Sequence, residues 1–372
     1  MKTLFRLAVL VAIVVAVIHF WPNIKGLFSK KTQAQVSHVI GTVKSDYKSA
    51  SNTASKISKA ISTPPPTAST SSTSLPSPAY SSGVSICAEP TCGYHQVVQA
   101  ILGARQVDLV MYELNSPSVE GALIAAHKAG ANVRVFLDRA YHGYSVNSSS
   151  AAFLQAHGVA VRFAPASVIL HEKAVILNNN AVYLMSGNLD HNYYTTSADW
   201  LIHDTNPGDV VNLVNAFNAD WNGDLASTPV DTGIQGNLLF SPDAETAYLN
   251  FINHATKSID LSSEEMIDPR VVNSLVAAAH RGIDVRVLMQ SGNISSATLS
   301  TLTTAGVHVR LLDSPTLYIH AKTLIIDGQV AILGSQNDST ASLVYNREAS
   351  LIITNPRLVT TATNDFNGWW VA

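Results

Sequence analysis

The sequence predicts an α/β protein built from two tandem, pseudo-symmetric repeats, each a mixed, mostly parallel sheet flanked by helices. Three observations lead to this fold class. Strand–helix–strand segments recur at a fixed spacing, a glycine ends the corresponding helix in each copy, and a hairpin closes each copy. The 372 residues are 47% hydrophobic and 13% charged, which gives enough apolar material for a sizeable core and too little charge for a disordered chain.

The repeat is clearest in one segment of each copy. Residues 121–135 and 273–287 align at an offset of 152, and both end in the strand motif Val-Arg-Val. In each segment an Ala- and Leu-rich helix stops at a glycine, Gly130 or Gly282, the residue type that ends helices in a left-handed conformation. Strands that alternate with helices of this length are typical of layered α/β units.

Each copy continues with a second helix and ends with an antiparallel hairpin. The second helices are expected at residues 149–157 and 296–305. The predicted hairpin strands are Ala174–Leu177 with Ala181–Leu184, and Thr323–Ile326 with Val330–Leu333. The dipeptide Asp327-Gly328 in the second hairpin is a strong signal for a tight turn, and three asparagines occupy the corresponding place in the first.

The N-terminal part is expected to lie outside the repeats. A nearly continuous apolar run from Leu4 to Trp21 is near the minimum length for a membrane span, and it indicates a membrane anchor or a cleaved signal segment. Bulky residues stand where a cleavage site needs small ones, which favours the anchor. We divide the chain into an anchor or signal (1–22), a helical stalk with a Ser/Thr/Pro-rich linker (23–84), a first repeat (85–230) and a second repeat (231–372).

The two cysteines, Cys87 and Cys92, stand close together where the first repeat begins. We interpret them as a structural disulfide, because their spacing is not C-x-x-C and no second pair follows that would complete a metal site. A disulfide places the catalytic part outside the cytosol, either anchored to the membrane or secreted if the N-terminal segment is cleaved. The net charge of −3 gives no overall basic balance of the kind that nucleic-acid-binding proteins show.

Reactive side chains recur at the edges of the two hairpins. They are His171, Lys173, Asn178, Ser186, Asn188 and Asp199 in the first copy, and His320, Lys322, Asp327, Ser335, Asn337 and Glu348 in the second. In both copies the serine follows the histidine by 15 residues, the asparagine by 17 and the acid by 28. Since residues two apart on a strand share a face, each histidine lies beside its lysine. Imidazole, ammonium, hydroxyl and carboxamide groups together suit a phosphate diester.

This pattern resembles the phospholipase D superfamily, and in particular its bacterial members of the cardiolipin synthase and nuclease types. The family signature is H-x-K-x4-D followed by G-S-x-N. The second copy matches it fully, whereas the first has Asn178 in place of the aspartate and Met185 in place of the glycine. The resemblance covers roughly Cys87 to the C-terminus, and it implies a phospholipase D-like fold with one active site at the interface between the repeats.

The resemblance also implies roles for the residues that match the signature. One histidine would form a covalent phosphohistidine while the other protonates the leaving alcohol, and by this analogy we assign His171 as nucleophile and His320 as general acid–base. Phosphate binding would fall to Lys173, Lys322, Ser186, Asn188, Ser335 and Asn337, and orientation of the histidines to Asp199 and Glu348. Asp327 is counted with the catalytic group and Asn178 as a supporting residue. No metal or other cofactor is implied.

The substitution at Asn178 leads to an expectation about rate. Asparagine keeps the size and hydrogen bonding of aspartate but lacks its charge, so a working but slower site is expected. If the aspartate of the family matters for its charge rather than its shape, Asn178→Asp should raise turnover several-fold.

Three functions are compatible with the sequence. The leading hypothesis is a phosphodiesterase that hydrolyses phospholipids or transfers their phosphatidyl group, which fits an enzyme held at a membrane by its N-terminal segment. The first alternative is an endonuclease that applies the same chemistry to nucleic acids, and the second is a non-catalytic phosphodiester-binding module. Both motifs lie in one chain, so a monomer would suffice for a complete site.

Overall fold

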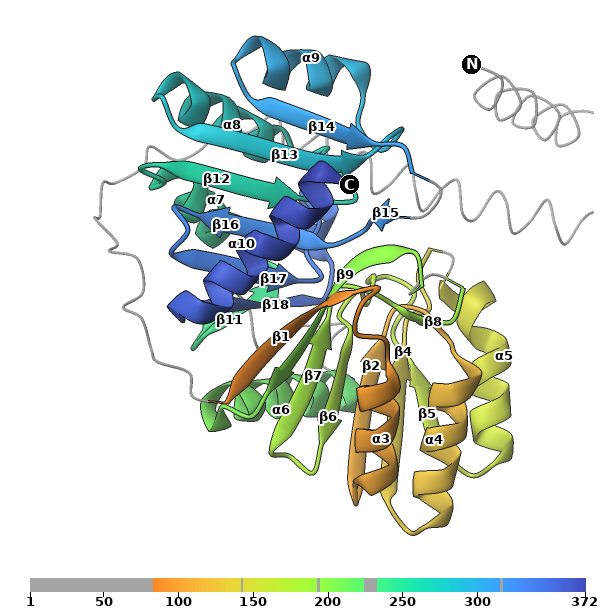
Figure 1. Ribbon diagram of the computed structural model, residues 1–372. Helices are drawn as coiled ribbons and strands as arrows, with labels where there is room; N and C mark the ends of the chain where they lie inside the picture. Colours follow the sequence, from red (N-terminus) through yellow and green to blue (C-terminus); the bar gives the residue numbers. More distant parts are fainter. Residues whose placement is uncertain (1–82, 142, 193–194, 224–232, 315–316) are drawn as a thin grey trace, which may run out of the picture. The chain divides into compact units, whose positions relative to one another are not determined.

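Two eight-stranded sheets, one for each repeat, form the framework of the protein. The computed structural model describes residues 83–141, 143–192, 195–223, 233–314 and 317–372 (Figure 1). The first sheet contains β1 (Val84–Glu89), β2 (Gln106–Met111), β4 (Asn132–Leu137), β5 (Ala160–Phe163), β6 (Ala174–Leu177), β7 (Ala181–Met185), β9 (Ser197–Asp204) and, from the second repeat, β15 (Tyr318–Ile319). The second contains β10 (Gly233–Gln235), β11 (Leu238–Ser241), β12 (Ser258–Ser262), β13 (Asp284–Gln290), β14 (His308–Leu312), β16 (Lys322–Ile326), β17 (Val330–Gly334) and β18 (Glu348–Ile353).

The strand orders confirm two repeated, mixed α/β halves. They are β1-β9-β7-β6-β2-β4-β5 and β10-β11-β18-β17-β16-β12-β13-β14, and a separate small sheet joins β3 (Leu114–Asn115) to β8 (Leu189–Asp190). The expectation that parallel pairs predominate is wrong. Parallel pairing joins β2, β4 and β5 and likewise β12, β13 and β14, whereas the hairpins and their neighbours add a larger antiparallel part to each sheet. Helices connect β2 to β4 and β4 to β5, and likewise β12 to β13 and β13 to β14, as parallel neighbours require, whereas tight turns join the antiparallel strands of the hairpins β6–β7 and β16–β17.

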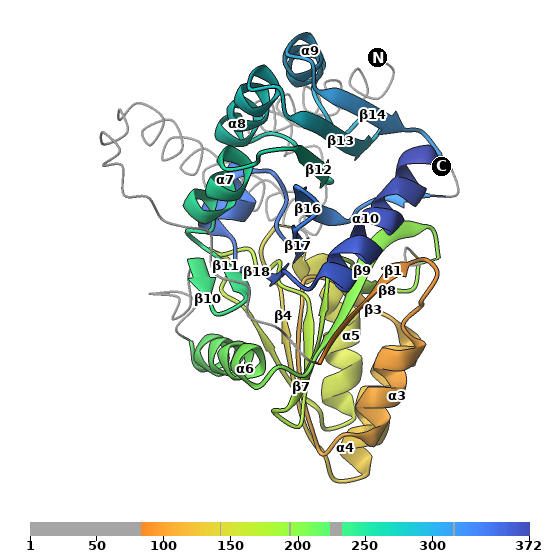
Figure 2. The same cartoon turned by 60° about the vertical axis from the view of Figure 1, so that its left-hand side comes forward.

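Helices cover both faces of each sheet (Figure 2). The helices of the first repeat are α3 (His95–Gly103), α4 (Pro117–Lys128), α5 (Gly143–Ala156) and α6 (Pro207–Asn222). Those of the second are α7 (Glu245–Asn253), α8 (Pro269–His280), α9 (Ser296–Thr304), the π-helix η3 (Ala341–Tyr345) and α10 (Pro356–Val371). Along β2, Leu109 packs beneath the outer helices, whereas its neighbour Val110 belongs to a core that both repeats share. Trp200, Phe240 and Phe366 also belong to that shared core.

The predicted helix ends and hairpins are present. Gly130 and Gly282 follow α4 and α8 with φ of 95° and 85°, the left-handed conformation expected for glycine there. The hairpins β6–β7 and β16–β17 turn through Asn178 and Asp327, which have φ of 51° and 55°. Asparagine and aspartate tolerate this conformation better than other residues with a side chain.

The helix α5 begins six residues before the predicted start at residue 149. Its first turns are rich in serine and asparagine, which favour helix interiors poorly, so the sequence gives little signal there. Asn147 is fully buried, and its side chain hydrogen-bonds to three backbone groups. Oδ1 accepts from the N–H of Leu114, and Nδ2 donates to the carbonyl oxygens of Tyr112 and Asp138. A polar residue thus occupies a core position.

The structure tests only part of the predictions for the N-terminal region. Cys87 and Cys92 form the predicted disulfide. The anchor or signal and the stalk and linker up to residue 82 lie outside the described residues, as does the predicted boundary between the repeats at residues 230 and 231. Within the part of the chain that the structure describes, none of the helices has the length and apolarity needed to cross a membrane.

Candidate active site

Each of the two histidines is hydrogen-bonded to a carboxylate from the other repeat. His171 Nδ1 lies 2.8 Å from Glu348 Oε2, and His320 Nδ1 lies 2.8 Å from Asp199 Oδ1. In each pair Nδ1–H donates to the carboxylate, which fixes the orientation of the ring and leaves Nε2 as the nitrogen that can react. The sequence-predicted histidines and acids therefore come together, but the pairs cross between the repeats.

Short strand contacts across the repeats bring these pairs together. β15 runs parallel to the start of β9, and the N–H of His320 donates to the carbonyl of Ala198 at 3.2 Å. At the equivalent place Leu170 forms a parallel bridge with Arg347, and the N–H of His171 donates to the carbonyl of Arg347 at 2.8 Å. Because each histidine lies beside the acid-bearing strand of the other repeat, crossed pairing follows from the way the repeats dock.

Both carboxylates are held in place by a second set of donors. Asp199 Oδ1 also accepts from Ser186 Oγ at 2.6 Å. Glu348 Oε1 accepts from Asn346 Nδ2 at 3.0 Å and from the hydroxyl of Ser342. In Asp199 the additional donor shares the oxygen that faces the histidine, and in Glu348 the additional donors bind the other oxygen. Both arrangements restrict rotation of the carboxylate, so the histidines are oriented before a substrate binds.

The structure corrects the prediction that Ser186 and Ser335 bind the substrate phosphate. Both serines are fully buried. Besides its bond to Asp199, Ser186 Oγ accepts from the N–H of Trp200 at 2.7 Å, and Ser335 Oγ accepts from the N–H of Ala349 at 3.2 Å. The hydroxyls therefore tie the acid-bearing strands β9 and β18 to the strands before them.

The two lysines lie beside their histidines, as predicted, but in different surroundings. Lys173 is completely buried, and its Nζ donates to the carbonyl of His171 at 2.7 Å and lies 5.2 Å from the centre of the Tyr112 ring. Lys322 Nζ lies 2.8 Å from His320 Nε2. The first lysine therefore faces neutral groups and the second faces a reactive nitrogen.

The two asparagines have hydrogen-bonding capacity to spare. Asn188 Nδ2 donates to Glu113 Oε2 at 3.1 Å. The side-chain oxygens of Asn188 and Asn337 are buried and have no hydrogen-bond partner among the described residues. Carboxamides with unused hydrogen-bonding capacity are suited to bind a polar ligand.

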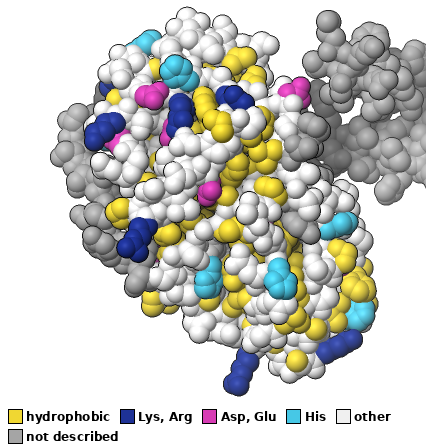
Figure 3. All heavy atoms as spheres, in the orientation of Figure 1, with side chains coloured by type: hydrophobic (Ala, Val, Ile, Leu, Met, Phe, Trp, Pro, Cys, Tyr) yellow, Lys and Arg dark blue, Asp and Glu magenta, His cyan; other side chains and the backbone are white. Residues whose placement is uncertain are grey.

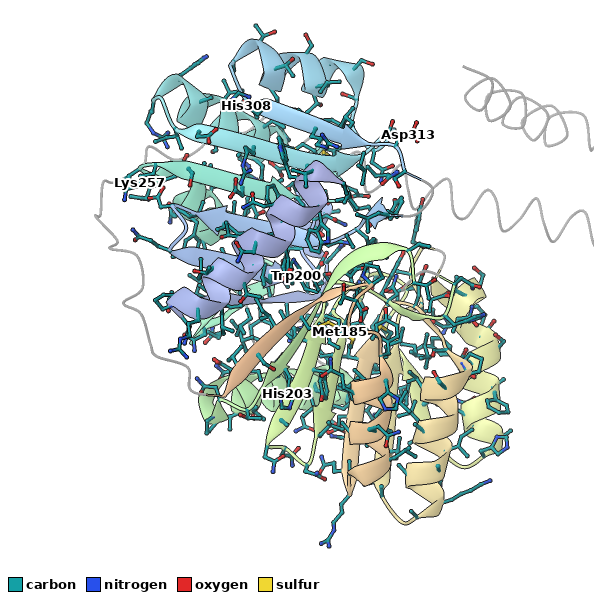
Figure 4. The ribbon with its side chains drawn as sticks, in the orientation of Figure 1. Met185, Trp200, His203, Lys257, His308 and Asp313 are labelled. Carbon is teal, nitrogen blue, oxygen red and sulfur yellow. A yellow bond between two sulfur atoms is a disulfide. The ribbon has the colours of Figure 1, made fainter. Side chains whose placement is uncertain are left out.

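The structure does not bring Asp327 to the site. It follows β16 at the end opposite to His320, so roughly 16 Å of strand separates it from Lys322. Its carboxylate accepts from the N–H groups of Thr256, Lys257 and Ser258 at 2.7 to 3.0 Å. Lys257 is labelled in Figure 4, at the end of β12 that lies away from β15. The placement of Asp327 in the catalytic group is therefore corrected, and its role is to fasten the hairpin turn.

Asn178 does the same in the first repeat. Its Oδ1 accepts from the N–H groups of Arg105 and Gln106 at 2.8 and 3.1 Å, the equivalent place before β2. An amide oxygen accepts these hydrogen bonds as a carboxylate does, so the substitution keeps the contacts. The expectation of a slower site because of Asn178 loses its basis.

Sequence reasoning missed one carboxylate that lies in the site. Glu264 Oε2 is 3.1 Å from His320 Nε2 and 3.3 Å from Lys322 Nζ. The repeat offset of 152 offered the one signal, because it places Glu264 at the position of Tyr112, within two residues of the end of the first strand of each copy. The ring of Tyr112 lies against His171 with 4.8 Å between the ring centres, so both positions contact a histidine.

The surroundings of the two histidines shift their pKa values in opposite directions. Burial, helped by the charge of Lys173, lowers the pKa of His171 to about 4, although Glu348 opposes the shift. Burial alone would lower the pKa of His320 as well, but the carboxylates of Asp199 and Glu264 raise it above its ordinary value. At neutral pH His171 is therefore unprotonated, and His320 retains its proton more readily than a free histidine.

Burial and neighbouring charges also shift the pKa values of Lys173 and Glu264. Burial and the nearby charge of Lys322 lower the pKa of Lys173 to about 7. Burial would raise the pKa of Glu264, but His320 and Lys322 hold it well below its usual range, so this carboxylate is ionised. Among the described residues, no group of three or more histidine, cysteine, aspartate and glutamate side chains is arranged to hold a metal ion.

Two α/β repeats that share one site, with a histidine, a lysine and an asparagine from each, define a phospholipase D-like protein. A family model described as "Cardiolipin synthase, PLD-like domain" matches residues 97–221 and 248–370, which is more than half of the chain. The chain belongs to this phospholipase D-like family.

Curated relatives carry the same family's names. A cardiolipin synthase of Listeria welshimeri is 25% identical in an alignment 298 residues long, which covers 68% of this chain and 61% of the relative. Phospholipase D Y of Dictyostelium discoideum is 29% identical in an alignment 168 residues long, which covers 39% of this chain and 37% of that protein. The chain thus spans less than two thirds of the length of these relatives.

Solved structures share the fold. Phosphatidylserine synthase of Haemophilus influenzae aligns with a TM-score of 0.62 and 12% identity over 77% of this chain and 86% of that one. Polyphosphate kinase of Porphyromonas gingivalis aligns with a TM-score of 0.60 and 15% identity over 77% of this chain and 50% of that one. At such identities the likeness establishes the fold alone.

Proposed function

We propose that this protein is a phosphodiesterase of the phospholipase D type, which hydrolyses phospholipids or transfers their phosphatidyl group through a phosphohistidine and without a metal ion. One observation carries the proposal: the crossed pairs His171–Glu348 and His320–Asp199, in which one imidazole is neutral and the other favours its protonated form. One neutral and one protonated imidazole are the nucleophile and the acid that an in-line displacement at phosphorus needs.

In the first step, Nε2 of His171 attacks phosphorus, and the bond from phosphorus to the leaving oxygen breaks. His320 gives its Nε2 proton to that oxygen, so the alcohol leaves neutral. In the second step, the now neutral His320 takes a proton from water or from an acceptor alcohol, whose oxygen attacks phosphorus as the bond to His171 breaks. Lys173 and Lys322 stabilise the negative charge on the non-bridging oxygens in both steps.

Phospholipids are the favoured substrate class. The matching family model and the Listeria and Dictyostelium relatives bear names of enzymes of phospholipid chemistry. On the face shown in Figure 3, Lys and Arg side chains lie apart from one another rather than in a continuous track of the kind that binds nucleic-acid backbones. An N-terminal anchor would keep the site near its substrate, and the Cys87–Cys92 disulfide supports a catalytic part outside the cytosol. A monomer would suffice, since one chain supplies both histidines.

The test is hydrolysis of phosphatidylcholine vesicles and of single-stranded DNA by the full-length chain, side by side in excess EDTA. We expect lipid turnover that falls by about a thousandfold or more in both His171→Ala and His320→Ala. A rapid quench followed by phosphopeptide mapping should find the adduct on His171 and not on His320.

Each other outcome changes the conclusion. DNA cleavage without lipid turnover would replace the phospholipase with a nuclease. Loss of activity in EDTA that returns with a divalent cation would reject the metal-free mechanism. An adduct on His320 would reverse the roles of the histidines, and no adduct or turnover with either substrate would favour the binding module.

A further inference from the structure

The two halves of the site differ most at one pair of equivalent positions, Tyr112 and Glu264. In the first half the ring of Tyr112 packs edge-on against His171, and Lys173 Nζ points to a carbonyl oxygen and lies over the ring. In the second half the carboxylate of Glu264 stands between His320 and Lys322. One half of the site therefore presents a cation without a carboxylate partner at bonding distance in the described residues, and the other already holds an anion.

The position of the Glu264 carboxylate is that of a ligand. Its Oε2 lies 3.1 Å from His320 Nε2 and 3.3 Å from Lys322 Nζ, the two atoms that would serve the leaving and non-bridging oxygens of a phosphodiester. The hydroxyl of Tyr318 donates to the other oxygen at 3.3 Å. Its side chain is 28% exposed, in contrast to 13% for His320 and 2% for Lys322, so it reaches the pair from the solvent side.

We propose that Glu264 is an internal anion of the phosphate site, which occupies the place between His320 and Lys322 in the free enzyme and is displaced when substrate binds. The proposal rests on the proposed function, because it takes these two groups as phosphate ligands. A phosphodiester carries one negative charge and replaces the carboxylate charge for charge. A phosphomonoester at neutral pH carries close to two, and the displaced carboxylate, still nearby, repels the second charge.

Glu264 is therefore a specificity residue that separates diesters from monoesters. It has a further effect on hydrolysis, because the product of phospholipid hydrolysis is itself a phosphomonoester. When water cleaves the phosphohistidine, the product gains a second ionisable oxygen, and the return of Glu264 to His320 and Lys322 favours its release. In the first half Tyr112 has no charge with which to do this.

The experiment is calorimetric titration of the full-length chain at pH 7.5 with inorganic phosphate, a mimic of the monoester, and with dimethyl phosphate, a mimic of the diester. The wild type is compared with Glu264→Gln and with Glu265→Gln, a control that removes the same charge from the adjacent, exposed residue. We expect Glu264→Gln to bind inorganic phosphate at least about tenfold more tightly, and dimethyl phosphate to gain less. Glu265→Gln should change either affinity less than about twofold.

Several results would overturn the proposal. An unchanged phosphate affinity in Glu264→Gln, or the absence of phosphate binding in both proteins, would show that Glu264 does not compete for this place. Equal tightening in Glu265→Gln would reduce the effect to general charge. Since the titration needs no turnover, lipid hydrolysis with unchanged phosphate affinity would reject the role of Glu264 and leave the proposed function standing. Tighter phosphate binding in Glu264→Gln without any diester cleavage by the wild type would support the role of Glu264 and reject the proposed function.

Discussion

The imidazole of His171 is oriented by Glu348, a carboxylate 177 residues further along the chain and in the other repeat, at 2.8 Å. In the same way the imidazole of His320 is oriented by Asp199, which lies 121 residues earlier in the chain and in the first repeat. Each histidine thus belongs to one repeat, while its backbone N–H and its imidazole Nδ1 both hydrogen-bond to the other. Changes at the two acids should consequently affect different histidines and, through them, different steps of the reaction.

This crossing can be tested by changing the acids one at a time. Glu348→Gln should abolish the low-field proton resonance of the His171 Nδ1–H and leave that of His320, and Asp199→Asn should do the opposite. Turnover should fall about 10²- to 10⁴-fold in each, since a histidine that has lost its orienting carboxylate is poorly placed. The resonances are assigned with His171→Ala and His320→Ala. If Glu348→Gln altered only the His320 signal, the pairs would lie within repeats.

The opposite pKa shifts predict a broad, bell-shaped dependence of kcat/KM on pH. His171 has to be unprotonated to attack, and its pKa is lowered to about 4, so the rate should fall only as pH drops through about 4. His320 has to be protonated, and its pKa is raised above 6.5, so its contribution is lost as pH rises through that higher value. Lys173, with a pKa lowered to about 7, also loses its charge on the alkaline side.

A matched variant separates these contributions on the alkaline side. Glu264→Gln removes a carboxylate that raises the pKa of His320, and it should move the alkaline limb to lower pH by more than it moves the acid limb, because Glu264 bonds to His320 and acts on His171 only at longer range. Initial rates on a soluble diester between pH 3.5 and 10, in buffers of constant ionic strength, give both limbs. A single limb near the ordinary histidine value of 6.5 would contradict the asymmetry between the two histidines.

The hairpin turns predict that a substitution at Asp327 lowers the stability of the fold but not the activity. Asp327→Ala removes the acceptor of three backbone N–H groups and places alanine at a φ of 55°, so the free energy of unfolding should fall by about 2 kcal/mol. Turnover per folded molecule should stay within about twofold, because no reacting group is touched. Urea unfolding and active-site titration measure the two quantities.

Asn178→Asp is the companion variant in the first repeat. It should leave turnover unchanged, against the sequence-based expectation of an increase, because the side chain accepts from the N–H groups of Arg105 and Gln106 at the turn. A several-fold rise in turnover at equal stability would mean that the charge at this turn reaches the site after all.

Much of the fold could be predicted because its signals are local. The glycines after α4 and α8 and the Asp-Gly turn each act within a few residues, and the repeat offset shows the same local patterns twice; all of them lead to the observed elements. The start of α5 was missed because Asn147 is buried through hydrogen bonds to three distant backbone groups, which leave no apolar pattern. The larger antiparallel part of each sheet depends on strand order, which periodicity does not record.

For the site, spacing alone identified both histidines, both lysines and both acids. It could not give their pairing, which depends on how the repeats dock through contacts such as Leu170 with Arg347. Nor could it tell a signature residue that faces the site from one that supports a turn or a strand, as Asp327 and Ser186 do. Glu264 escaped notice because the signature contains no residue at its position.

Crossed orientation has a consequence for how the two copies can diverge. In a pair of identical subunits, every substitution would appear on both sides of the shared centre, and both imidazoles would have the same surroundings. Joined in one chain, the copies are free to differ, and here a tyrosine lies beside one histidine and a glutamate beside the other. If either copy were replaced by a second copy of the other, both histidines would have the same neighbour, so the asymmetry of the site requires the two repeats to differ.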